Sequence, residues 1–209
     1  MEIEAKYALP DEDTGLAILD APYVRDRSVG TVHIIRMEST YYCDHAGKLD
    51  AGGFTLRLRR ENGRGVCCLK QDVSKDGGIK KRYEQECAAE TIEDGVRGLM
   101  LLGVPSAFAE AVRDVHFMVA AQVQFVRRSL LLELDGACAE LAFDAGAFGK
   151  TKTVPFYELE VEWKSGAEGP FEAFLRDLER EFSLTPQNMS KYARAKAAES
   201  GILLENGIT

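Results

Sequence analysis

The sequence lacks the long apolar stretch that a membrane-spanning helix needs. Such a helix takes about 20 apolar residues, whereas the longest candidate run is Leu99–Val104. Neither a basic segment nor an apolar segment follows Met1, so we expect no secretory signal and no membrane association. No repeat, low-complexity tract or Pro/Ser-rich linker interrupts the chain, and we therefore expect a single domain over residues 1–209.

Cysteine and histidine do not occur in patterns that carry metal or redox chemistry. The five cysteines form no CxxC pair, and an odd number does not suit a disulfide framework. The three histidines show no metal-ligand spacing. We interpret the cysteines as reduced and mostly buried side chains of a cytoplasmic protein.

The chain also has no excess of positive charge. Lys and Arg number 26 against 34 Asp and Glu, which gives a net charge of −8. Binding of nucleic acid by a general electrostatic field requires a basic surface, so we expect no nucleic-acid partner. The content of 45% hydrophobic and 29% charged residues is typical of a folded globular protein.

The clearest pattern that is present is an alternation with period two, which is typical of strands. Short turns such as Asn62-Gly63 and Asp76-Gly77-Gly78 separate several segments, which favours hairpins and a mostly antiparallel sheet. We expect strands over residues 2–7, 31–43, 54–60, 65–72, 79–88, 121–134, 138–144 and 154–163. We expect helices after Pro10 and over residues 91–102, 106–115, 169–182 and 190–200.

Several of these strands carry charge on one face only. Glu158, Glu160 and Glu162 share a face, and neighbours on one face lie about 6–7 Å apart. These like charges repel unless cations lie among them. One such strand is ordinarily a solvated face with cross-strand ion pairs, but the pattern recurs on five strands. Other same-face sets are Glu2, Glu4 and Lys6; Arg57 and Arg59; Arg82, Glu84 and Glu86; and Glu140 and Asp144.

A closed barrel would place one face of every strand in a shared interior. If the charged faces point inward, the interior becomes a polar tunnel, and helices cover part of the apolar outside. Carboxylate oxygens are the ligands that Mg²⁺ and Mn²⁺ prefer, and guanidinium groups match phosphate oxygens two at a time. Such an interior suits a metal-bound polyphosphate, whose terminal phosphoryl group a metal-activated water could attack without a protein nucleophile.

Taken in order, the motifs resemble those of the CYTH family, the triphosphate tunnel metalloenzymes. Glu2-x-Glu4-x-Lys6 resembles the family's ExExK motif, and residues 158–162 (ELEVE) resemble its ELELE strand. Further matches are Leu56–Arg59 to LRxR, Leu69-Lys70 to the lysine strand, Arg82-Tyr83-Glu84 to RxE, Phe125–Arg127 to the central arginine, Glu140–Gly146 to ExxxDxG, and Ser190–Tyr192 to the C-terminal SK motif. The similarity runs from residue 2 to about residue 196.

The resemblance implies an α+β fold built on an eight-stranded antiparallel β-barrel, a tunnel with a charged interior and helices packed outside. It implies Mg²⁺ or Mn²⁺ held by Glu2, Glu4, Asp144, Glu158, Glu160 and Glu162. It implies phosphate binding by Lys6, Arg57, Arg59, Lys70, Arg82, Arg127 and Lys191, with Glu84 and Glu140 orienting those cations. Glu2, Glu4, Lys6 and Glu160 would take a direct part in catalysis. Strand parity leaves open whether Arg127 or Arg128 faces the tunnel.

The activity that the resemblance implies is hydrolysis of inorganic triphosphate to pyrophosphate and phosphate. The chain looks most like the tunnel half of bacterial inorganic triphosphatases without their helical CHAD domain, acting on a small-molecule triphosphate as a monomer or homodimer. Thiamine triphosphatase is an alternative, for which Tyr41 or Tyr42 could stack on the organic rings, since Trp163 has outward parity. Class IV-type adenylyl cyclase is another. A non-catalytic polyphosphate-binding module is disfavoured, because pure binding needs only the cations.

Overall fold

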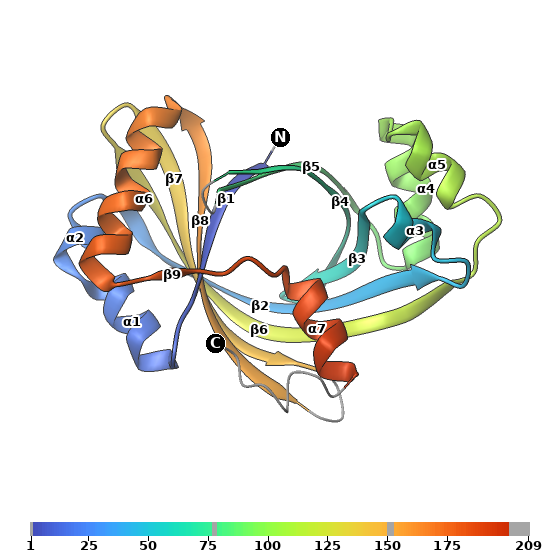
Figure 1. Cartoon of the computed structure of the whole chain (residues 1–209), viewed down its shortest axis with the longest axis horizontal. Helices are drawn as coiled ribbons and strands as arrows, with labels where there is room; N and C mark the ends of the chain where they lie inside the picture. Colours follow the sequence, from blue (N-terminus) through green and yellow to red (C-terminus); the bar gives the residue numbers. More distant parts are fainter. Residues whose placement is uncertain (1, 77–78, 150–152, 201–209) are drawn as a thin grey trace.

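Eight strands close into an antiparallel barrel in the computed structural model, which describes residues 2–76, 79–149 and 153–200. The strands follow the order β5-β4-β3-β2-β6-β7-β8-β1, and β1 pairs with β5 to close the sheet (Figure 1). This architecture confirms the predicted fold class. The strands are β1 (Glu2–Ala8), β2 (Ser28–Asp44), β3 (Phe54–Glu61), β4 (Arg64–Asp76), β5 (Ile79–Ala88), β6 (Phe117–Leu134), β7 (Ala137–Phe148), β8 (Val154–Gly166) and the short β9 (Thr185–Pro186), which pairs with β1.

Helices cover the outside of the barrel on two opposite sides. They are α1 (Glu12–Asp20), α2 (Pro22–Arg25), α3 (Lys48–Ala51), α4 (Ile92–Leu102), α5 (Ser106–Ala111), α6 (Glu168–Phe182) and α7 (Lys191–Glu199). In Figure 1, α1, α2 and α6 lie on one side, α3, α4 and α5 on the other, and α7 lies beside the opening. No helix among the described residues is long and apolar enough to cross a membrane.

The element boundaries differ from the predicted ones mainly where a partner strand decides them. β2 and β6 extend beyond the predicted ranges because their flanking residues pair with each other, Asp44 with Phe117 and Ser28 with Leu132. The short α2, α3 and β9 were not predicted, and α5 ends at Ala111 rather than at residue 115. The Asn62-Gly63 turn has φ angles of 49° and 88°, the left-handed pair that a tight hairpin requires. In the other predicted turn, Gly77 and Gly78 lie outside the described residues.

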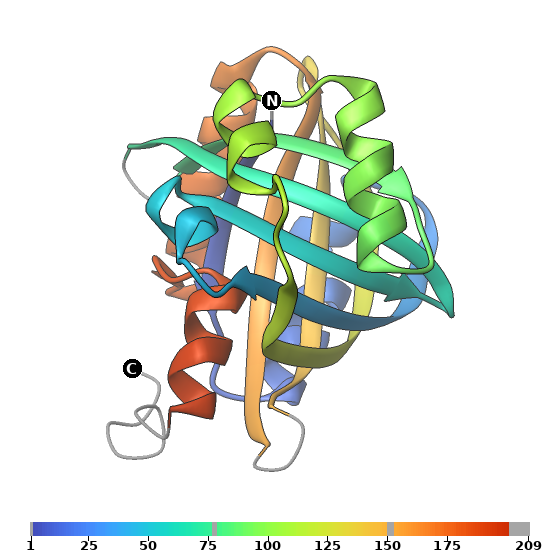
Figure 2. The same cartoon turned by 90° about the vertical axis from the view of Figure 1, so that its right-hand side faces the viewer.

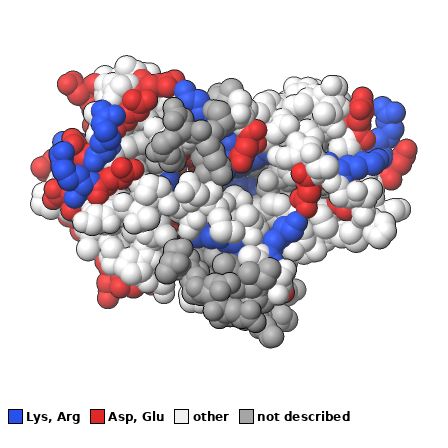
Figure 3. Space-filling view, in the orientation of Figure 1, with Lys and Arg blue, Asp and Glu red and all other residues white. Residues whose placement is uncertain are grey.

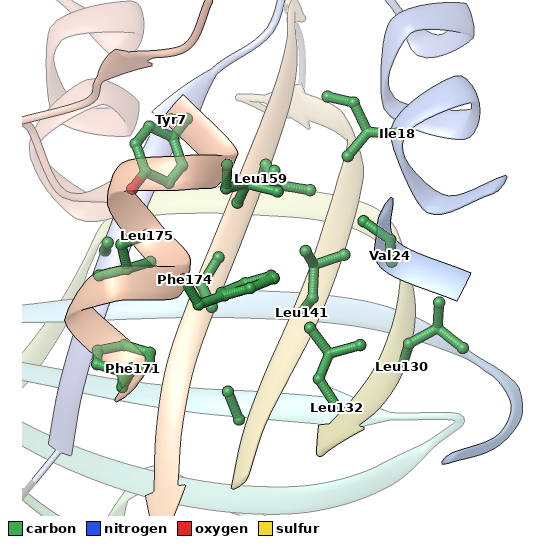
Figure 4. Packing of buried hydrophobic residues seen from close by; sticks show 14 of the residues in the cluster. Tyr7, Ile18, Val24, Leu130, Leu132, Leu141, Leu159, Phe171, Phe174 and Leu175 are labelled. Carbon is green, nitrogen blue, oxygen red and sulfur yellow. The ribbon is translucent and has the colours of Figure 1, made fainter. Parts of the chain in front are cut away.

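The larger outer core fills the space between β1, β6, β7, β8 and the helices α1, α2 and α6. Figure 4 shows Ile18 and Val24 at the α1 and α2 end of this cluster, Phe171 at the α6 end and Phe174 between them. Gly15 lets α1 approach closely, since a Cβ atom there would lie 2.2 Å from the ring of Phe143. The apolar side chains of these strands therefore face the helices outside the barrel. The alternate side chains of the same strands face the interior.

A second outer core lies under α3, α4 and α5, which cross β3, β4 and β5 (Figure 2). A third cluster lies at the α7 end of the barrel and contains inward residues of β2 and β6, such as Met37 and Phe125, together with Ala195 and Ala198 of α7. The interior is thus charged over most of its length but apolar where α7 packs. The sequence analysis predicted a charged interior and did not predict this apolar section, because the section forms only when α7 packs against it.

Candidate active site in the barrel interior

The barrel encloses a cavity of about 520 Å³, and most of the side chains around it are charged. Figure 3 looks toward the barrel opening and shows Lys and Arg side chains within the central hollow of this face. The charged lining consists of Glu2, Glu4, Lys6, Arg57, Arg59, Glu61, Lys70, Asp72, Arg82, Glu84, Glu86, Arg127, Glu140, Glu160, Glu162, Lys164 and Lys191. All predicted site residues are in this lining except Asp144 and Glu158, which lie directly beneath it with no exposed surface.

The structure decides between the two adjacent arginines of β6. Arg127 lines the cavity and donates to both carboxylate oxygens of Asp144, at 2.8 and 2.7 Å. Arg128 points to the outside, where its guanidinium lies 3.3 Å from Glu12 of α1. The phosphate-binding candidate of this strand is therefore Arg127.

The ammonium group of Lys191 occupies the centre of a carboxylate triad. Asp144, Glu158 and Glu160 each offer an oxygen, and these oxygens lie within 4.8 Å of one another. Lys191 Nζ lies 2.8 Å from both Asp144 and Glu160 and also contacts Glu158. Burial alone would lower the pKa of Lys191, but the three carboxylates outweigh it and raise the pKa, so the group stays protonated.

Glu160 is the most heavily paired carboxylate of the site. Its oxygens contact Lys6 at 2.6 Å, Lys191 at 2.8 Å, and Arg127. Burial would raise the pKa of Glu160, but these three cations hold it well below its usual range. Lys6 shows the reverse effect: burial would lower its pKa, whereas Glu160 and Glu4 raise it. Both groups are therefore ionised at neutral pH.

Glu158 differs from the other two glutamates of its strand. It has no exposed surface, and it contacts Lys191 and the guanidinium of Arg194, which is itself 1% exposed. Arg194 also stacks its guanidinium over the ring of Phe148, at 5.0 Å. The repulsion expected along this strand face is thus relieved by protein cations in the ligand-free protein, and Arg194 was missed by sequence reasoning. Its spacing of three residues from Lys191 on α7 was the available signal, since such residues share a helix face.

The N-terminal glutamates of β1 pair with cations of β4 and β5. Glu2 accepts from Lys70 at 2.7 Å, and Glu4 accepts from Arg82 at 2.5 Å and lies 3.1 Å from Lys6. Arg82 is held from its other side by Asp72 at 2.6 Å. Asp72 was not predicted, although it shares the parity of Lys70 in the same strand.

Glu162 has fewer cationic partners than Glu158 and Glu160 of the same strand. Its closest cation is Lys164 at 2.8 Å, and Lys164 is also 3.9 Å from Glu140. Burial raises the pKa of Glu162; Lys164 offsets part of that effect, while Glu2 and Glu140 add to the rise. Glu140 thus faces Lys164 and Glu162, whereas Glu84, the other residue expected to orient cations, lies 3.1 Å from Lys70.

Among the cations that line the cavity, Arg57 of β3 has the weakest ion pairing. Arg57 has its nearest carboxylate, Glu86, at 3.9 Å, whereas Arg59 has Glu86 at 3.0 Å and Glu61 at 2.5 Å. The Nε atoms of both arginines are buried and have no hydrogen-bond partner among the described residues. Burial would lower the pKa of Arg57, but Cys68, Tyr41, Glu84 and Glu86 raise it, so the guanidinium stays charged. Of the two arginines, Arg57 has the weaker ion pairing and lines the cavity.

The donor chemistry of the interior suits both halves of a metal–polyphosphate complex. The carboxylates supply hard oxygen ligands, and the raised pKa of Glu162 marks a place where a divalent cation would relieve crowding of negative charge. The free guanidinium donors and the lysines supply partners for phosphate oxygens. Fold and site together define a barrel whose interior presents carboxylates and cations to one cavity.

The chain belongs to the CYTH domain family, whose model matches residues 1–195. No curated protein matches the chain. Among solved structures, a putative adenylyl cyclase from Hippeastrum, HpAC1, described as having a dominant triphosphatase activity, aligns over 100% of both chains with 19% identity and a TM-score of 0.63. The PH1012 protein of Pyrococcus horikoshii covers 92% of this chain and 98% of its own, with 17% identity and a TM-score of 0.55. A putative adenylate cyclase of Vibrio parahaemolyticus covers 91% and 94%, with 13% identity and a TM-score of 0.53. At these identities the likeness shows the fold alone.

Proposed function

We propose that this protein is a metal-dependent triphosphatase that hydrolyses inorganic triphosphate to pyrophosphate and phosphate inside the barrel. The observation that carries the proposal is the alternation of buried, ionised carboxylates and cations around one cavity. A site for a polyanion alone would need only the cations, because carboxylates repel phosphate unless a divalent ion lies between them. The triphosphatase activity described for the Hippeastrum protein, which shares the fold, supports this choice.

The cations of the interior bind the phosphate chain in this proposal. The set is Lys6, Arg57, Arg59, Lys70, Arg82, Arg127 and Lys191. Arg57 lies 3.9 Å from its nearest carboxylate and can donate to phosphate oxygens without breaking a close ion pair, whereas Arg59 would exchange contacts with Glu61 and Glu86. Lys6 and Arg127 lie on either side of Glu160 and keep their protons, so they can stabilise the negative charge that grows on the leaving oxygen.

The metal site in this proposal is made of oxygen ligands. The candidates are Glu2, Glu4, Asp144, Glu158, Glu160 and Glu162, for Mg²⁺ or Mn²⁺. Four of them line the cavity, while Asp144 and Glu158 lie beneath it and hold Lys191 and Arg127 in position. A bound divalent ion would neutralise phosphoryl oxygens and activate the attacking water.

An organic triphosphate such as thiamine triphosphate is the second candidate substrate. The observation that favours it is the apolar part of the lining, which includes Ile35, Met37, Tyr41 and Phe125. Tyr41 lines the cavity and stacks on Tyr192 with 5.1 Å between ring centroids, so an aromatic surface borders the phosphate-binding residues. Tyr42, the other tyrosine considered, is not part of the lining.

We further propose that residues 1–209 form one domain and that the protein works in the cytoplasm as a monomer or homodimer. All five cysteines are free thiols, which suits a reducing compartment.

The proposal is tested by phosphate release from inorganic triphosphate, thiamine triphosphate, ATP and pyrophosphate, each with Mg²⁺ and with Mn²⁺, while cyclic AMP is monitored. We expect release from inorganic triphosphate that requires the metal. Faster turnover of thiamine triphosphate would favour the second candidate, and cyclic AMP from ATP would identify a cyclase. Binding of triphosphate without turnover under any condition would identify a non-catalytic module.

A further inference from the structure

One contact of α7 lies outside the barrel and is not explained by the charged interior. Asp50 of α3 accepts a hydrogen bond from Tyr192 Oη at 3.1 Å and forms an ion pair with Lys196 Nζ at 2.7 Å. The two partners are four residues apart, so they lie on one face of α7. Lys196 also lies 5.2 Å from the centre of the Tyr192 ring. The contact is therefore a three-residue network joining segments more than 140 residues apart.

The α3 end of this network is rigid. Asp44 accepts from the backbone N–H groups of Lys48 and Leu49 at 2.9 and 2.8 Å, which caps the first turn of α3. Leu49 is 1% exposed and packs in the core beneath α4 and α5. Asp50 is thus presented from a fixed turn rather than from a loose loop.

The α7 end of the network leads directly into the active site. Ser190 caps α7 by accepting from Ala193 N at 3.1 Å, and Lys191 enters the cavity from the first turn. Tyr192 follows and stacks on Tyr41 of the lining. The positive charge of a lysine in the first turn of a helix interacts unfavourably with the positive end of the helix dipole. The position of Lys191 therefore depends on the other contacts that hold α7 in place.

Inside the barrel, α7 is held by contacts that a substrate would disturb. Lys191 is paired with Asp144, Glu158 and Glu160, and a metal–triphosphate complex would compete for these same charged groups. Tyr192 also borders the cavity, but Asp50 and Lys196 do not line it. The ion pair between Asp50 and Lys196 is therefore a polar contact of α7 for which a ligand in the cavity would not compete directly.

We propose that Asp50 is a positioning residue, which latches α7 through Tyr192 and Lys196 so that Lys191 stays directed into the cavity when triphosphate binds. This inference rests on the proposed function for its substrate. An isolated exposed ion pair contributes little, so the effect belongs to the network, in which burial and Asp50 raise the pKa of Tyr192 to about 12 and keep its hydroxyl a donor.

The test compares the wild type, Asp50→Ala, the charge exchange Asp50→Lys with Lys196→Asp, and the control Asp135→Ala in the exposed turn between β6 and β7. Hydrogen exchange of the α7 amides is measured with inorganic triphosphate bound in the absence of metal, together with the Kd for triphosphate. For Asp50→Ala we expect exchange in α7 to accelerate about tenfold and Kd to rise about fivefold, while β6 amides are unchanged.

The charge exchange recreates the ion pair with reversed sign but removes the acceptor of Tyr192, so exchange in α7 and the affinity should return only part of the way to the wild-type values. Unchanged α7 exchange in Asp50→Ala, or acceleration equal to that of Asp135→Ala, would overturn the latch. With metal present, Asp50→Ala should raise KM while kcat stays within about twofold. The exchange measurement needs no turnover, so failure of the latch and failure of the proposed triphosphatase activity are seen separately.

Discussion

Two regions of the barrel interior differ in how their charges are compensated. Around β8 the central charges have several partners: Glu160 contacts three cations, and Lys191 contacts three carboxylates. On β3, Arg57 lies 3.9 Å from its nearest carboxylate, and the Nε atoms of Arg57 and Arg59 are unpartnered. We call the first region the β8 network and the second the β3 arginines.

The difference shows that one interior can serve stability and binding at separate places. In the β8 network the attraction between close charges offsets the desolvation of each, so removing one member leaves the others uncompensated. Among the β3 arginines, Arg57 has no close carboxylate, and an anion bound in the cavity would supply a partner for it. Four predictions follow from this contrast, and each can break or sharpen it.

Glu160→Gln should give the largest effect, because Glu160 belongs both to the β8 network and to the proposed metal site. We expect kcat for triphosphate with Mg²⁺ to fall at least about a hundredfold. Unfolding stability should fall by about 3–5 kcal/mol, since three buried cations lose a shared partner. Steady-state kinetics and urea unfolding measure the two effects.

The matched control for Glu160→Gln is Glu12→Gln, which removes a carboxylate from the exposed pair with Arg128. It should change neither quantity appreciably. Near-normal turnover in Glu160→Gln would mean that the charged face of β8 takes no part in the reaction.

Arg57→Ala should act on binding rather than on stability. We expect KM for triphosphate to rise about tenfold to a hundredfold, because a charged donor with spare hydrogen bonds is lost. The melting temperature should stay the same or rise, since no close ion pair is broken. The control is Arg60→Ala on the same strand, whose side chain pairs with exposed Glu90 at 2.9 Å. Equal changes of KM in both variants would contradict the assignment.

The stability contributed by Glu160 should depend on pH. Its pKa in the folded protein lies well below the ordinary value of about 4.3 for Glu. The contribution is therefore complete above the unfolded pKa and is lost as the pH falls through the lower folded pKa. In urea unfolding between about pH 3 and pH 7, the difference between wild type and Glu160→Gln should shrink below about pH 4. A difference that does not vary with pH would argue against the ionised network.

Glu162→Gln should have the smallest effect on the metal-free protein. Because burial, Glu2 and Glu140 raise the pKa of Glu162, its ionised form is less favoured in the folded protein than in water. The melting temperature without metal should equal or slightly exceed that of the wild type. The rise in melting temperature that Mg²⁺ produces in the wild type should shrink, because a ligand has been removed. An undiminished Mg²⁺ effect would place the ion elsewhere.

Much of this site could be predicted from strand periodicity. Because side chains alternate across a strand, the spacing of Arg57 and Arg59 fixed their shared face, and the resemblance to a known motif set chose the inward side. Parity could not choose between Arg127 and Arg128, since either suits a strand; the pairing of Arg128 with α1 settles the question.

Part of what escaped prediction depends on tertiary contacts of α7. Arg194 lies in a helix with an ordinary polar sequence, and only the position of that helix against Glu158 and Phe148 makes it a buried charge. For the same reason the sequence could not separate Glu158 from Glu162. The two lie on one strand face, but one is sealed beneath Lys191 and the other borders the cavity.

The closure of the barrel by β1 also has a consequence for biosynthesis. β1 carries Glu2, Glu4 and Lys6, yet it is secured by β8 and β5, and Lys6 meets Glu160 across 154 positions of the chain. Contacts of such long range form late in folding. A ribosome-bound chain that has not yet exposed β8 and α7 has an open sheet edge and scattered charges in place of a finished site. The charged cavity should therefore form in one step, when the last strands emerge and pair with the first strand.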